Sequence, residues 1–107
     1  MKFIVERKTW FRGKGAEESR LLRNDGTRCC IGFVGKQCGV TDEEMLNRSV
    51  IKRVSEPGLK GFPEWMYEMR KIDDAYTWND TTDYTDQERE ARLIAVFAKH
   101  GDEIEFV

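Results

Sequence analysis

The segment TDQEREARLIAVFAKHGDEIEFV, residues 85–107, carries the clearest structural signal in this chain. Thr85 and Glu88 have the spacing of a capping box, in which each side chain accepts a hydrogen bond from the backbone N–H of the other residue. Gly101 stands where a residue in the left-handed conformation commonly ends a helix. We therefore predict a helix between Thr85 and Gly101. Its expected apolar face consists of Ala91, Leu93, Ile94, Phe97 and Ala98.

Two segments at the chain ends have the composition of β-strands. Residues 2–10 alternate and are rich in strand-forming residues, and residues 104–107 form a short terminal strand. We predict that these segments pair in one sheet that helices cover. The expected fold class is α+β, with a small sheet that includes the paired N- and C-terminal strands and about three to four helices packed on it. The length of 107 residues suits a single globular domain over residues 1–107.

The segment TRCCIGFVGKQCG, residues 27–39, contains all three cysteines. Thr27 is expected to cap a helix that Gly39 ends. Gly32 and Gly35 each lower the intrinsic stability of a helix by about 1 kcal/mol relative to alanine, which is tolerable where another element packs closely against them. The expected buried stripe of this helix consists of Cys30, Val34 and Cys38.

The cysteines do not have the spacing of a metal site or of a disulfide. Structural zinc usually takes four Cys or His ligands in closely spaced pairs, whereas this chain has no Cys-x-x-Cys and a single histidine. In one helix, Cys30 and Cys38 would lie about 12 Å apart along the axis, and a disulfide needs Cα atoms within about 7 Å of each other. We expect neither a metal ion nor any other cofactor.

A reactive thiol is the remaining chemical hypothesis for this segment. Cys29 and Cys30 would lie in the first turn of the predicted helix, where free backbone N–H groups and the helix dipole stabilise a thiolate. The alternative is that both side chains are buried, as cysteines commonly are. No Ser-His-Asp pattern, carboxylate pair or dinucleotide fingerprint is visible. Enzyme function is therefore disfavoured, and a thiol-dependent enzyme stays open as an alternative.

The leading candidate for a binding surface is an acidic and aromatic segment in the second half of the chain. Aromatic side chains among acidic ones are suited to anchoring a basic partner. The alternative is a solvated polar loop, including residues 79–84, whose aromatic rings turn inward. The predicted partner-binding residues are Tyr76, Trp78, Asp80, Asp83 and Tyr84.

A basic stretch with aromatic residues near the N-terminus is a candidate nucleic-acid site. Its cations could contact phosphates while an aromatic ring stacks on a base. The alternative is a strand end followed by a loop, and the acidic pI near 5.5 opposes general nucleic-acid binding. The candidate nucleic-acid-binding residues are Lys8, Trp10, Arg12, Lys14 and Arg20.

Charge is distributed unevenly along the chain. Residues 1–71 carry 15 basic and 10 acidic residues, and residues 72–107 carry 3 basic and 10 acidic residues, for net charges of +5 and −7. This asymmetry predicts either two separated charged faces or a fold that interleaves the two halves. No apolar run approaches membrane-spanning length, and the odd number of cysteines favours reduced thiols. We therefore expect a cytoplasmic protein with no membrane partner.

Two segments, RLLRNDGTRCCIGFVGKQCGV (residues 20–40) and NDTTDYTDQEREARLIAVFAKHGDEIEFV (residues 79–107), resemble small uncharacterised phage and prophage accessory proteins. The resemblance implies a phage or mobile-element origin and assigns no catalytic residues. Accessory proteins of this kind often bind and block a host protein, including host-defence machinery. The leading hypothesis is a phage-type accessory protein of the host cytoplasm that binds a macromolecule. A host or phage protein is the expected partner, and nucleic acid is the alternative.

Overall fold

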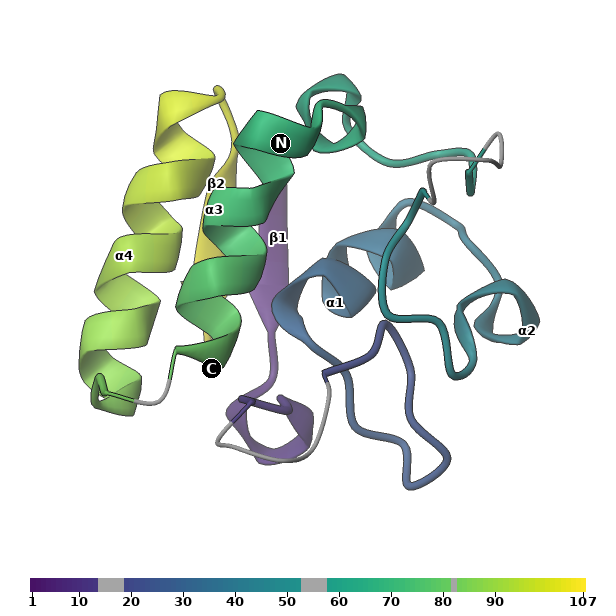
Figure 1. The fold of residues 1–107 in the computed structure, drawn as a ribbon, viewed down its shortest axis with the longest axis horizontal. Coiled ribbons are helices and arrows are strands. Elements are labelled where there is room, and N and C mark those ends of the chain that lie inside the picture. Colours follow the sequence, from purple (N-terminus) through teal and green to yellow (C-terminus); the bar gives the residue numbers. More distant parts are fainter. Residues whose placement is uncertain (14–18, 53–57, 82) are drawn as a thin grey trace.

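The first and last strands of the chain pair directly with each other. β1 (Lys2–Val5) and β2 (Glu103–Phe106) run parallel, with Phe3 opposite Ile104. Figure 1 shows the two strands side by side behind the helices, although almost the whole chain separates them in sequence. The predicted pairing of the terminal strands and the α+β fold are confirmed. This computed structural model describes residues 1–13, 19–52, 58–81 and 83–107.

The helices pack around this small sheet. α1 lies against β1, α4 lies against β2, and α3 contacts both α1 and α4. Figure 1 shows α3 and α4 side by side in front of the strands, with α1 next to β1 and α2 further out. The described residues contain four α-helices, in agreement with the predicted three to four. The helices are α1 (Cys30–Gln37), α2 (Asp42–Met45), α3 (Met69–Asp80) and α4 (Asp86–Lys99), with 3-10 helices η1 (Arg7–Thr9) and η2 (Glu64–Tyr67).

The first strand is shorter than predicted. β1 ends at Val5, and η1 follows it where the sequence predicted a continued strand. Phe3 and Val5 are fully buried, as the alternating pattern requires, whereas the η1 residues are not buried. Each strand has four residues, and backbone pairing of the two chain ends continues one step further, where the Arg7 N–H donates to the Val107 carbonyl at 2.8 Å.

The predicted capping box of α4 is present. The Thr85 hydroxyl accepts a hydrogen bond from the Glu88 backbone N–H at 3.1 Å, and the Glu88 carboxylate accepts one from the Thr85 N–H at 3.2 Å. The predicted apolar face is partly wrong, since Ile94 is 46% exposed and Ala91 and Ala98 are also exposed. The buried side of α4 is the narrower stripe of Arg89, Leu93 and Phe97.

α1 begins later than predicted and has a different cap. Its first residue is Cys30, and the preceding Cys29 makes no side-chain capping hydrogen bond. The Thr27 hydroxyl instead donates to the Asp25 carboxylate at 2.6 Å within the turn before the helix, so Thr27 is not the cap. Gly39 has φ +87° and ends the helix as predicted. In the predicted stripe, Cys30 and Val34 are fully buried and Cys38 is partly exposed.

α3 is a helix that the sequence analysis did not predict, and its last two residues fall within the expected polar loop. Its buried residues are Ile72, Ala75 and Asn79, so only one large apolar side chain marks the inner face. Such a stripe gives weak hydrophobic periodicity. The helix forms here because α1 and α4 supply neighbours for that face.

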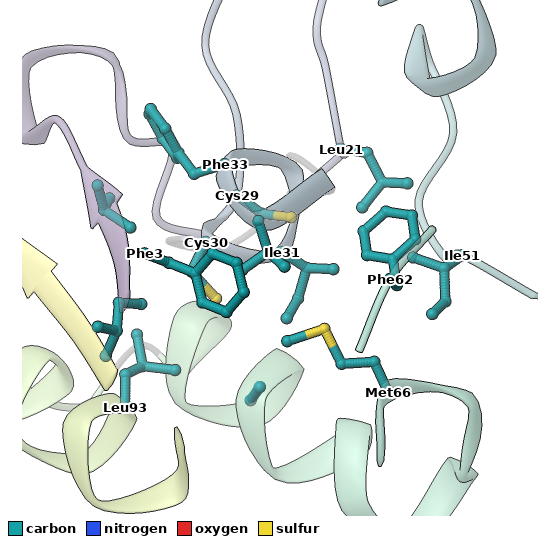
Figure 2. Close-up of a cluster of buried hydrophobic side chains, with 14 of the residues drawn as sticks. Phe3, Leu21, Cys29, Cys30, Ile31, Phe33, Ile51, Phe62, Met66 and Leu93 are labelled. Atoms are coloured by element: carbon teal, nitrogen blue, oxygen red, sulfur yellow. The ribbon is translucent and has the colours of Figure 1, made fainter. Parts of the chain in front are cut away.

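The core lies between the sheet and the helices. Figure 2 shows side chains from β1, α1, α4 and the segment around residues 51–66 converging on one cluster. The rings of Phe3 and Trp65 both meet Phe97 edge to face, with centroids 6.2 Å and 5.3 Å away respectively. All described parts of the chain thus share one hydrophobic core.

Folding interleaves the basic first half of the chain with the acidic second half. Ion pairs between described residues cross between the halves, and several of them border the sheet. They join the Met1 amino group to Asp102 at 3.1 Å, Lys2 to Glu105 at 2.6 Å, Arg7 to Glu90 at 2.7 Å and Arg12 to Asp86 at 3.5 Å. The charge asymmetry of the sequence is therefore partly neutralised by contacts within the fold.

Candidate functional site

The residues predicted to bind a partner do not form one surface. Tyr76 and Trp78 are two positions apart on α3, so their side chains leave the helix about 200° apart. The Tyr76 hydroxyl accepts a hydrogen bond from the Ile51 backbone N–H at 3.3 Å. Trp78 instead packs edge to face on Tyr84, with ring centroids 5.0 Å apart. The predicted surface divides into two, one on each side of α3.

Asp80 is exposed at the end of α3, and its carboxylate is at the same time engaged in hydrogen bonds within the protein. Its carboxylate accepts hydrogen bonds from the Gly13 backbone N–H at 3.3 Å, from the Asn79 amide at 2.9 Å and from the Ser19 hydroxyl. These contacts hold residues 13 and 19 against the end of α3. Asp83 lies exposed in the loop that leads to α4. Both predicted acidic residues are thus exposed, and Asp80 differs from Asp83 in that its carboxylate already has partners within the protein.

An open apolar cavity lies beside α3, on the side that Tyr76 faces. Its volume is about 570 Å³. Lys52 and Asp73 add charge at its lining. Burial raises the pKa of Tyr76, so its hydroxyl stays neutral. The apolar and aromatic lining includes Val50, Ile51, Met66, Met69, Ile72 and Tyr76.

Met69 is the side chain most exposed to solvent among the apolar residues of this cavity. It is 61% exposed, whereas Ile51, Met66 and Ile72 are buried. Of the cavity residues, the sequence analysis singled out Tyr76 alone. The signal that could have revealed the others is the i, i+3, i+7 spacing of Met69, Ile72 and Tyr76, which is typical of one helix face.

Trp10 is not available to stack on a base, which corrects its place in the predicted nucleic-acid site. Its side chain is 4% exposed, and its indole N–H donates to the Asn79 amide oxygen at 2.7 Å. Its ring packs on Phe106, with centroids 4.6 Å apart. The Arg12 guanidinium lies over the same ring at 4.2 Å. The aromatic element of the predicted site is therefore part of the core.

The predicted basic contacts are engaged within the protein to different degrees. Arg12 pairs with Asp86, and Arg20 donates to the Asn47 side chain at 2.9 Å. Lys8 lies exposed in η1. Lys14 lies outside the described residues. Because Trp10 is buried and Arg12 covers it, the stacking arrangement that motivated a nucleic-acid site is absent from the described part of this surface.

The thiols of Cys29 and Cys30 are buried, and their environment opposes ionisation. Burial raises the pKa of Cys29 to about 12, and it also raises the pKa of Cys30. Backbone N–H groups at the start of α1 act in the opposite direction on both thiols, as predicted, but desolvation outweighs them. The thiolate expected in the first helical turn is therefore not favoured by this structure.

Alkylation of the folded protein should modify Cys38 before Cys29 or Cys30. Cys38 is partly exposed, whereas the other two thiols are almost completely buried. Burial also raises the pKa of all three thiols, which slows the reaction further. Mass spectrometry of protein treated with iodoacetamide, with and without urea, will give the order of modification. Rapid labelling of Cys29 in the absence of urea would contradict its burial and restore the thiol hypothesis.

Comparisons with known proteins add no assignment to this geometry. No protein-family model, no curated protein and no solved structure matches the chain. Within the described ranges, no three His, Cys, Asp or Glu side chains gather as a metal site would require, and no helix is long and apolar enough to cross a membrane. The fold and the site together define a small α+β protein with an open apolar cavity beside α3.

Proposed function

We propose that this chain is a binding protein that captures a protein partner by receiving an apolar side chain of that partner in the cavity beside α3. The observation that supports this proposal is an open cavity of about 570 Å³ whose lining is mainly apolar. Side chains that fill such pockets often dominate the affinity of protein interfaces. We therefore retain the hypothesis of partner binding. We now propose that the binding surface lies on the side of α3 that Tyr76 faces.

The chemistry of the lining supports binding rather than catalysis. Burying apolar surface contributes about 25 cal/mol per Å² removed from water, so the apolar walls can stabilise a bound apolar group. Met66 and Met69 add adaptable side chains that can adjust to the shape of an occupant. The hydroxyl of Tyr67 donates to the Leu59 carbonyl, and that of Tyr76 accepts from the Ile51 N–H. Both hydroxyls are thus engaged in holding the cavity walls.

The resemblance to phage accessory proteins supports a particular setting for this activity. We propose that the partner is a host protein, which includes components of host defence. This part of the proposal rests on the resemblance of residues 20–40 and 79–107 alone. The cavity supports only the proposal that an apolar side chain of the partner enters it. That proposal can be tested without knowing which protein the partner is.

A Met69→Lys substitution should weaken partner capture at least about tenfold, which corresponds to about 1.4 kcal/mol. The substitution places a charge at the cavity lining where the proposed interface requires an apolar surface. Ile94→Lys is the matched control, because Ile94 is 46% exposed on α4 and does not line the cavity. Affinity capture from a lysate with quantitative mass spectrometry, followed by titration of the captured protein, will measure both effects.

Two outcomes of this experiment would contradict the cavity as the binding site. One is equal capture by the wild type and by Met69→Lys, with both folded by circular dichroism. The other is retention by Met69→Lys together with loss by Trp78→Ala, which would assign binding to the opposite side of α3. Trp78 is suited to this comparison because it packs with Tyr84 and Arg92 and does not line the cavity.

A further inference from the structure

A second, more polar pocket lies between η1, the turn at residues 23–26 and helices α1 and α2. Its volume is about 430 Å³, and it shares no lining residue with the cavity beside α3. Three cationic side chains, those of Arg23, Arg28 and Lys36, line it. The acidic side chains of Glu6 and Asp42 also contribute to the lining, so cations exceed acids by one. Arg28 and Lys36 supply the positively charged donors that an anionic occupant needs.

Arg28 is the central residue of this pocket. It is only 5% exposed, and its backbone is held in place on both sides. The Arg28 N–H donates to the Thr9 carbonyl at 3.0 Å, and the Arg28 carbonyl accepts from the Phe11 N–H at 2.7 Å. The backbone that carries this side chain is therefore fixed at the wall of the pocket.

The guanidinium of Arg28 is only half satisfied. Nη2 donates to the Asp42 carboxylate at 2.6 Å, whereas Nη1 is buried and has no hydrogen-bond partner. A buried donor without an acceptor costs about 1–3 kcal/mol, and native proteins commonly satisfy such groups with water, an ion or a ligand. A guanidinium presents parallel N–H donors that match two oxygens of a carboxylate or phosphate. The contact with Asp42 uses only part of that capacity.

Asp42 is well placed to leave Arg28 when a ligand binds. Its side chain is 66% exposed, so little packing holds it in position. The hydrogen bond from Arg28 lowers the pKa of Asp42 and keeps the carboxylate ionised. A ligand oxyanion that replaces Asp42 leaves the buried Arg28 guanidinium with a negatively charged partner, so the exchange does not leave a buried charge unpaired.

We propose that this pocket binds the oxyanion group of a ligand, a phosphate or a carboxylate, which displaces Asp42 and bridges the two terminal nitrogens of Arg28. Lys36 adds a second positive charge to the pocket. Leu22, Phe33 and Leu46 form an apolar part of the wall, and Leu46 is 45% exposed. The ligand therefore combines an oxyanion with an apolar body. This site is separate from the proposed function and does not depend on it.

Titration of the protein with inorganic phosphate, phenyl phosphate and benzoate will test the site. Amide NMR shifts should change saturably around Gly26, Arg28 and Leu46. Phenyl phosphate should bind more tightly than inorganic phosphate because only its ring can contact the apolar wall. A preference for phenyl phosphate over benzoate identifies a phosphate ligand, and the reverse preference identifies a carboxylate. Absence of saturable shifts with all three probes would overturn the proposal.

Two substitutions with opposite expected effects distinguish this site from general charge attraction. Lys36→Gln should weaken the affinity for phenyl phosphate about fivefold, and Asp42→Asn should strengthen it about fivefold, because it removes the competing carboxylate. Lys71→Gln is the matched control, since Lys71 is a lysine of α3 whose side chain is 44% exposed and pairs with Glu68 outside the pocket. Equal weakening by Lys36→Gln and Lys71→Gln, or no gain from Asp42→Asn, would overturn the bridging arrangement.

Discussion

Replacing Asn79 with alanine should lower the free energy of unfolding by about 3–5 kcal/mol, because it leaves several buried groups without partners. Asn79 is 1% exposed near the end of α3. Its amide oxygen accepts from the Trp10 indole N–H at 2.7 Å and from the Cys30 backbone N–H at 3.0 Å. Its amide nitrogen donates to the Phe11 carbonyl at 3.1 Å. One side chain thus joins the N-terminal segment, α1 and α3.

The hydrogen bond to Cys30 gives Asn79 the role of a helix cap that acts from a distant part of the chain. The first N–H groups of a helix have no partner within the helix, and a side chain close in sequence usually supplies one. Here Cys29 makes no side-chain cap, and the acceptor lies 49 residues away. Removing it therefore affects the start of α1 as well as the packing of Trp10.

Urea unfolding followed by tryptophan fluorescence will measure the loss of stability in Asn79→Ala. Asp74→Ala is the matched control, because Asp74 is an exposed residue of the same helix and should change the free energy of unfolding by less than about 0.5 kcal/mol. A loss below about 1 kcal/mol for Asn79→Ala would show that water or neighbouring groups replace these hydrogen bonds.

The Gly32→Ala substitution should destabilise the fold by about 3 kcal/mol or more, although alanine is favoured over glycine in an isolated helix by about 1 kcal/mol. A Cβ at position 32 would overlap the carbonyl group of Leu21, lying 2.7 Å from its carbonyl carbon. Leu21 is fully buried, and its backbone N–H donates to the Arg48 carbonyl at 2.8 Å. The Leu21 backbone is therefore held in place, and moving it away from a new Cβ would cost further free energy.

Gly35→Ala provides a graded comparison within the same helix. A Cβ at position 35 would meet the Met45 sulfur and the Phe62 ring, each at 2.7 Å, and both are side-chain groups. A methionine side chain can move, so the expected loss is smaller than for Gly32→Ala, at about 1–2 kcal/mol. Urea unfolding of the two variants will give their order. A Gly32→Ala protein at least as stable as the wild type would contradict the close approach of α1 to Leu21.

Structural features that depend only on residues close together in the chain were predictable from the sequence. The capping box predicted at Thr85 is present, and Thr41 and Glu44 form a second one at the start of α2, because each box needs only two residues three positions apart. The left-handed glycine at position 39 depends equally on local geometry. The two strands were recognisable from alternation, since Phe3, Val5, Ile104 and Phe106 are the buried positions.

The candidate sites were harder to predict because they depend on which distant segments meet. The cavity joins residues 50–52 to η2 and α3, and that helix was not predicted. Its inner face contains Asn79, a polar residue whose burial is favourable only because Trp10 and Cys30 supply its partners. The buried Arg89 likewise occupies a position on α4 that the pattern alone would assign to solvent.

The sequence by itself determined where α4 begins and ends, that the two chain termini form strands, and that Cys30 and Val34 lie on the buried side of α1. These features follow from local backbone geometry and from the spacing of apolar residues. Only the tertiary structure decided that Trp10 is buried, that the Asp80 carboxylate accepts a hydrogen bond from the Gly13 N–H, and that Tyr76 and Trp78 face opposite sides of α3. The physical reason is that the free energy of burying a polar or aromatic side chain depends on the partners that folding brings to it.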